Sequence, residues 1–124
     1  MRIIYATRTG NVALFARRLT HPTQKLTENL HVSEPYVLVT YTDKFGEAPE
    51  IVRRFLRDNS EYLRGVAASG NRNFGRGFAG AADEIAREYG VPVLLKFELA
   101  GTPSDIQKFT DEVKRIGAEN LSLH

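Results

Sequence analysis

The sequence predicts an α/β protein built on a doubly wound, five-stranded parallel sheet in the order 2-1-3-4-5, with helices on both faces. Four short apolar runs show almost no alternation with polar residues, which is typical of strands buried on both faces of a parallel sheet. Between these runs, apolar residues recur at helical spacing. Because strands and helices alternate along the chain, we expect right-handed crossovers between parallel strands.

The strands are expected where the four apolar runs lie, at residues 3–6, 36–41, 66–68 and 91–97. A weaker run at residues 23–26 supplies the fifth strand. The stretch around it, residues 20–34, is polar and gives the weakest signal in the chain.

Four helices are indicated by apolar stripes and by residues typical of helix ends. The stripes lie within residues 12–19, 51–56, 78–89 and 106–116. Pro49 suits the first turn of the second helix, and Gly90 is expected to stop the third. Thr102 suits a cap of the fourth helix and Pro103 its first turn, while residues 120–124 are expected to fray.

Composition favours one soluble domain that spans residues 1–124. Hydrophobic residues make up 42% of the chain, and no apolar run approaches the ~20 residues that cross a bilayer. The N-terminus shows no secretory signal, so a cytoplasmic protein is expected. The absence of cysteine excludes disulfides, thiolate nucleophiles and iron–sulfur clusters, so any redox role requires a bound cofactor. A net charge of +2 does not indicate a nucleic-acid binder.

Doubly wound sheets bind ligands beyond the carboxyl ends of their strands, at the point where the strand order reverses. Three loops are expected to meet there, at residues 7–11, 42–48 and 69–77. The first loop offers hydroxyls, a glycine and the amides of a helix N-terminus, which suit a phosphate group. The other two combine glycines, asparagines and phenylalanines, which suit a flat ring with polar edges. Each loop alone would also fit a structural turn.

Several motifs in these loops resemble those of one protein family. The Thr-x-Thr-Gly-Asn turn after the first strand is similar to the phosphate loop of flavodoxins. The sequence Ser-Gly-Asn-Arg-Asn-Phe-Gly at residues 69–75 closely resembles the NrdI family of flavodoxin-like proteins. Residues 36–42, the pairs Phe45-Gly46 and Pro49-Glu50, and residues 96–102 are similar to that family as well. The resemblance covers nearly the whole chain.

The resemblance implies a flavodoxin-like fold that binds FMN non-covalently and activates class Ib ribonucleotide reductase. In that family, the reduced flavin is thought to react with dioxygen and to supply superoxide or peroxide to the dimanganese centre of the small subunit, where a tyrosyl radical forms. The implied partners are the small subunit of the reductase, dioxygen and an unidentified reductant of the flavin, without nucleic acid, membrane or bound metal. The flavin carries the chemistry, so no catalytic side chain is expected.

The resemblance also assigns FMN-binding residues. The phosphate would be held by Thr7, Arg8, Thr9, Gly10, Asn11 and Val12. One side of the flavin ring would be flanked by Thr42, Lys44, Phe45 and Gly46. The other side and the edge of the ring would be held by Gly70, Asn71, Asn73, Phe74 and Gly75.

Lys44 departs from the family pattern, in which glycine precedes the Phe-Gly pair. A peptide flip toward N5 of the reduced flavin would lack the freedom that glycine gives, which affects how the one-electron-reduced flavin is stabilised. In addition, Lys44, Arg72 and Arg76 would make the site less negative than in acidic carrier flavodoxins and favour an anionic reduced flavin, unless these side chains point to solvent.

Two other functions fit the same loops. A general electron-transfer flavodoxin would need an acidic docking face, and a non-redox module for a phosphate-bearing ligand would stay colourless with FMN. The remaining polar residues have structural explanations. His21, His31 and His124 lack neighbours at metal-ligand spacing, while Glu84, Glu88 and the Arg53-Arg54-Arg57 cluster suit solvated helix faces.

Overall fold

The five strands form one parallel sheet in the order β2-β1-β3-β4-β5, which confirms the predicted fold class and strand order. The computed structural model describes residues 1–122, and side chains through residue 119. The strands are β1 (Arg2–Tyr5), β2 (Thr23–Lys25), β3 (Tyr36–Thr40), β4 (Leu63–Gly70) and β5 (Val93–Glu98). The helices are α1 (Asn11–Arg17), α2 (Glu50–Asn59), α3 (Gly80–Tyr89) and α4 (Pro103–Ser122), with two short 3₁₀ segments, η1 (Ser60–Tyr62) and η2 (Arg72–Gly77).

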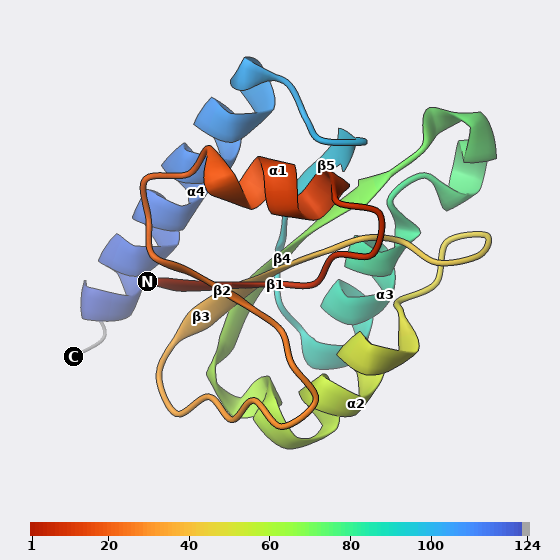
Figure 1. Ribbon diagram of the computed structural model, residues 1–124. Coiled ribbons are helices and arrows are strands. Elements are labelled where there is room, and N and C mark those ends of the chain that lie inside the picture. The colour runs from red at the N-terminus through yellow and green to blue at the C-terminus, as the bar shows by residue number, and fades with distance from the viewer. Residues whose placement is uncertain (123–124) are drawn as a thin grey trace.

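Helices cover both faces of the sheet, with α1 and α4 on one side and α2 and α3 on the other (Figure 1). On the first face, the Phe15 ring stacks on Phe97 at 4.1 Å and meets Phe109 edge-on at 5.4 Å. On the second face, buried residues of β3 and β4 pack against Val52, Leu56 and other apolar side chains of α2 and α3. All five residues of β3 are buried, as its unbroken apolar run predicts.

The last strand departs from that pattern because it forms an edge of the sheet. In β5, Val93 and Glu98 are exposed and only Leu94 and Phe97 are buried. The expectation that this apolar run is buried on both faces is therefore wrong. An edge strand has a neighbour on one side only, so its apolar residues need not all be covered.

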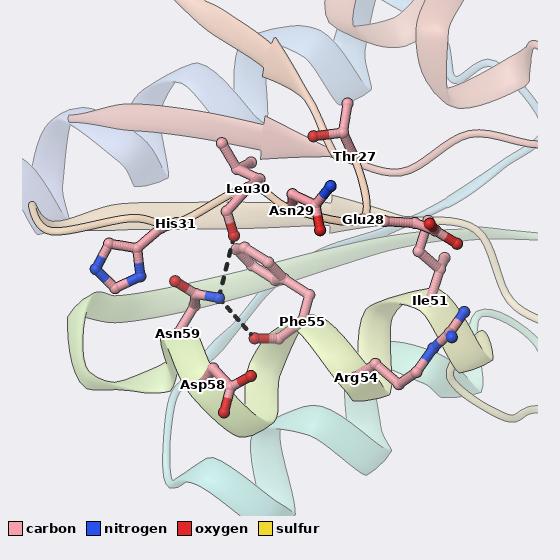
Figure 2. Close-up of a pocket in the computed structure, with 10 residues that line it drawn as sticks. All are labelled: Thr27, Glu28, Asn29, Leu30, His31, Ile51, Arg54, Phe55, Asp58 and Asn59. Carbon is pink, nitrogen blue, oxygen red and sulfur yellow. Dashed lines mark hydrogen bonds between the residues drawn. The ribbon is translucent and has the colours of Figure 1, made fainter.

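The connection between β2 and β3 contains no helix. Its residues 26–35 run across the α2 side of the sheet as an irregular segment, in which Leu26 and Val32 are buried. The buried side chain of Asn59, at the end of α2, holds this segment: its oxygen accepts from Val32 N–H (2.9 Å) and its amide donates to Leu30 O (3.4 Å) and Phe55 O (3.0 Å; Figure 2). A buried amide side chain thus satisfies backbone groups that a helix would pair internally.

Element ends differ in part from the sequence predictions. β4 is longer than expected, so the predicted loop 69–77 consists of the end of the strand followed by η2. Pro49 has an extended backbone and precedes the first residue of α2, so its expected place in the first turn is wrong.

The ends of the last two helices mostly follow the predictions. Gly90 ends α3 in a left-handed conformation, as predicted. Thr102 caps α4 reciprocally, because its hydroxyl accepts from Asp105 N–H (3.1 Å) while the Asp105 carboxylate accepts from Thr102 N–H (2.8 Å). Helix α4 continues through residues 120–122, where fraying was expected, and residues 123–124 lie outside the described part of the chain.

Candidate functional site

The three predicted loops meet at the carboxyl ends of the strands. They border an open cleft of about 240 Å³ beyond the ends of β1, β3 and β4. In Figure 1 the loops after β3, in yellow, and after β4, in green, project beyond the sheet on the same side. The cleft is lined by Thr7, Arg8, Thr9, Asn11, Val12, Tyr41, Thr42, Lys44, Ser69, Gly70, Asn71, Phe74, Gly77 and Leu99.

The first loop leaves several hydrogen-bond donors free. Gly10 precedes α1 with φ of 98°, and no side chain caps this helix. Thr7 accepts from Ala13 N–H (3.3 Å), whereas the amides of Asn11 and Val12 have no acceptor among the described residues. A Cβ built on Gly10 would meet no atom within 4 Å, so there is room beside these donors. Free amides, two threonine hydroxyls and open space match the chemistry of a phosphate group.

The second loop is a tight turn with a strained backbone. Asp43 and Glu47 pair through N–H to O bonds of 2.8 and 2.9 Å, which bring the two ends of the turn together. Within the turn, Lys44 has φ of 47° and Gly46 has φ of 117°, values that disfavour side chains. Phe45 at the tip is 86% exposed.

The third loop is ordered by its own side chains. Asn71 accepts from Asn73 N–H (2.9 Å) and thereby caps η2. Phe74, which is 52% exposed, meets Phe45 of the second loop edge-on at 6.3 Å between ring centroids. An aromatic pair therefore joins the two loops next to the cleft.

The second and third loops also contact each other through backbone. A Cβ on Gly77 would lie 2.5 Å from Phe45 O, and one on Gly80 would lie 2.7 Å from Gly46 O. Only glycine permits this approach, so Gly77 fixes the separation of the two loops and Gly80 that of the second loop from α3.

Three carboxylates near the loops that form the cleft are paired with cations. Asp43 pairs with Arg8 at 2.5 Å, Glu47 with Lys44 at 3.7 Å and Glu98 with Arg72 at 3.8 Å. Tyr41, beneath Arg8, has a raised pKa because of burial and the charge of Asp43, partly offset by Arg8. The opening carries no surplus of negative charge from these groups.

The structure brings together ten of the fifteen predicted site residues as lining of the cleft. The other five lie in the same loops without lining it: Gly10, Phe45, Gly46, Asn73 and Gly75. Sequence reasoning missed Tyr41, Ser69, Gly77 and Leu99 as lining residues, although all four lie in or beside the loops and strand ends it had identified. Arg72 and Arg76 do not line the cleft, and Arg72 instead stacks on the Phe78 ring at 4.4 Å.

A larger hollow of about 480 Å³ lies elsewhere, between residues 27–31 and α2 (Figure 2). Its central amide, Asn59, has its hydrogen bonds satisfied by backbone groups. Its described lining includes no buried polar side-chain atom without a hydrogen-bond partner.

No helix within the described residues is long and apolar enough to cross a membrane. Within the same part of the chain, no three histidine, aspartate or glutamate side chains gather as metal ligands.

The fold and the cleft define a flavodoxin-like protein. Solved flavodoxins share the fold: one from Streptococcus pneumoniae TIGR4 aligns with a TM-score of 0.69 at 22% identity, covering 95% of this chain and 97% of that one. A Fusobacterium nucleatum flavodoxin bound to flavin mononucleotide aligns with a TM-score of 0.58 at 17% identity, covering 95% and 96%. At these identities the likeness concerns the fold alone.

Sequence comparison then gives the family. The model of the family described as NrdI flavodoxin-like matches residues 3–111. A protein named NrdI from Bacillus licheniformis is 44% identical over 117 residues, which cover 94% of this chain and 89% of the relative. The chain belongs to the NrdI flavodoxin-like family, and the resemblance noted from its motifs is confirmed.

Proposed function

We propose that this chain binds FMN in the cleft at the carboxyl ends of the strands and activates class Ib ribonucleotide reductase. The observation that carries the proposal is the convergence of three loops on one cleft in a member of the NrdI family. Bound FMN, once reduced, would supply electrons to dioxygen, and the resulting superoxide or peroxide would serve the dimanganese site of the small subunit. We place this activity in the cytoplasm.

The first loop would hold the phosphate. The free amides of Asn11 and Val12 and the hydroxyl of Thr9 would donate to phosphate oxygens, while Arg8 adds positive charge nearby. Gly10 leaves the space that the phosphate needs. These groups bind the cofactor and orient it, and they take no part in electron transfer.

The second and third loops would flank the flavin ring. Thr42 and Lys44 would flank one side of the ring, and Gly70, Asn71 and Phe74 would hold its other side and edge, since all five line the cleft. Phe74 and neighbouring Phe45 would shield the ring from water, whereas Asn71 is already fixed by its bond to Asn73 N–H. The loops would set the orientation and the electrostatic surroundings of the flavin.

The charge pattern favours reductase activation over the general electron-carrier function. A carrier that docks on many redox partners would need an acidic face, but Asp43, Glu47 and Glu98 are each paired with a cation. These pairs leave little free negative charge around the opening.

The proposal is tested with the purified chain. FMN is added, the visible spectrum is recorded, and the protein is reduced without oxygen. It is then mixed with air and the manganese-loaded small subunit of a class Ib reductase. We expect bound flavin, rapid reoxidation in air, and a tyrosyl radical detectable by electron paramagnetic resonance. A chain that binds no FMN would exclude every flavin function, and bound FMN without radical formation would favour the general carrier.

A substitution tests where the phosphate binds. Asn11→Asp places a negative charge at the predicted phosphate position, so we expect FMN affinity to fall about tenfold or more, corresponding to at least about 1.4 kcal/mol. Riboflavin, which lacks the phosphate, should bind the variant and the unsubstituted chain equally. Asn29→Asp is the matched control, because Asn29 is exposed beside the other hollow. Equal losses for both ligands would contradict this assignment.

A further inference from the structure

Helix α3 contacts the loop 42–48 at its start, in its middle and at its end. Ala81 N–H donates to Thr42 Oγ1 (3.4 Å) at the start, and the Gly80 backbone meets Gly46 in the middle. At the end, the carboxylate of Glu84 accepts from Ala48 N–H at 2.6 Å. Because Gly80 and Glu84 are four residues apart, they lie on the same face of the helix. This face is a platform on which the loop rests.

Glu84 is the charged group of this platform, and its contacts differ from the solvated position expected from sequence. One carboxylate oxygen binds Ala48 N–H, while the other accepts from the guanidinium of Arg53, on α2, at 2.8 Å. Ala48 is buried, and its N–H has no other acceptor among the described residues. Without Glu84, this donor would remain buried and unpaired, which is costly.

Arg53 reinforces the position of the carboxylate. Its side chain is 40% exposed, but its Nε is buried without a hydrogen-bond partner among the described residues, so within this guanidinium the bond to Glu84 is the one made by Nη2. The pair joins α2, α3 and the end of the loop. Neither Arg53 nor Glu84 lines the cleft, so an effect on the cleft must act through the loop.

We propose that Glu84 is a positioning residue, which fixes the loop 42–48 in the geometry that receives the flavin ring. Through Ala48 it holds the end of the turn that carries Lys44 and Phe45, and so it sets how tightly the ring is bound and at what potential the flavin is reduced. The proposal rests on the FMN-binding function proposed above.

The test compares Glu84→Ala and Glu84→Gln with Glu88→Gln. Glutamine at residue 84 retains an oxygen acceptor for Ala48 N–H but loses the charge that pairs with Arg53. Glu88 lies one turn further along α3 and carries the same charge, but its carboxylate makes no hydrogen bond or ion pair with any described residue. Each protein is measured for amide exchange of residues 43–48 without FMN, for FMN affinity, and for the midpoint potential of the bound flavin.

For Glu84→Ala we expect faster exchange across residues 43–48 and FMN binding weakened about tenfold, since a charge-assisted hydrogen bond to the loop is lost. Glu84→Gln should recover most of the affinity, and Glu88→Gln should match the unsubstituted chain. The midpoint potential should shift in Glu84→Ala and return toward its original value in Glu84→Gln. Such a rescue would show that the effect of Glu84→Ala comes from the lost hydrogen bond to the loop and not from the loss of a negative charge on α3.

The inference is overturned if Glu84→Ala shows unchanged exchange, affinity and potential, or if Glu88→Gln causes an equal loss. Failure of the FMN-binding proposal would be recognised separately, because the unsubstituted chain would then bind no FMN. In that case, amide exchange of residues 43–48 measured without FMN would still decide whether Glu84 holds the loop.

Discussion

Two irregular segments of this chain, residues 26–35 and 42–48, are held in place in different ways. The first connects β2 to β3, buries Leu26 and Val32, and is fixed by the buried side chain of Asn59. The second follows β3, exposes Phe45, and is held from outside by backbone contacts and Glu84. The crossover therefore contributes to the core, whereas the turn keeps its central side chains available. We expect substitutions in the first to affect stability and in the second to affect FMN binding.

The largest effect is expected from Asn59→Ala. The substitution leaves Val32 N–H and Leu30 O without their partner, so the free energy of unfolding should fall by about 2–4 kcal/mol. Chemical denaturation measures this loss. FMN affinity of the folded variant should change little, because the crossover lies away from the cleft. A large loss of affinity with unchanged stability would contradict the comparison.

A smaller loss of stability is expected from Gly80→Ala. Alanine normally favours a helix, but a Cβ here would lie 2.7 Å from Gly46 O, so we expect a net loss of about 1 kcal/mol and about tenfold weaker FMN binding. The control is Gly117→Ala in α4, where the added Cβ meets no atom within 4 Å. That variant should gain about 0.5–1 kcal/mol and bind FMN normally. Thermal or urea unfolding and flavin titration distinguish the two, and a gain in both would argue against the close contact.

The smallest effect is expected from Lys44→Gly. Lys44 has φ of 47°, and glycine adopts this conformation without the cost of a side chain, so stability should rise by up to about 0.5 kcal/mol. The exposed ion pair with Glu47 contributes little to offset the gain. Lys44→Ala removes the same ion pair but retains the strain, so it should show no gain in urea unfolding. Equal stability of both variants would indicate that the backbone strain is negligible.

The two segments also show how far sequence reasoning reached. Apolar runs and helical stripes predict the strands and helices, since each signal lies within a few residues, and the doubly wound fold that they indicate supplies the strand order. The crossover gave no such signal, because Asn59, which orders it, follows Val32 by 27 positions. The sequence likewise predicts a solvent-exposed Glu84, because its partner Ala48 lies 36 positions away and local patterns do not reveal the contact. Local patterns predict elements, but they do not predict which distant polar groups meet.

For the candidate site too, local signals predict which loops form the cleft, but they do not predict every contact between distant residues. Loop composition and the family motifs identified ten residues that line the cleft, because the carboxyl ends of parallel strands gather at one edge. Tyr41 and Leu99 were missed, although each directly follows a strand, where side chains can face the cleft. The pairing of Arg72 with Phe78 and Glu98 depends on tertiary contacts that its sequence neighbours do not reveal.

The paired charges around the cleft bear on how a partner would approach it. Arg8 with Asp43, Lys44 with Glu47 and Arg72 with Glu98 form short dipoles whose fields largely cancel within a few ångströms. Electrostatic steering needs an extended patch of one sign, and it weakens as salt shortens the range of the field. These three pairs would therefore give an approaching protein little steering, so close shape and aromatic contact would contribute more to its capture.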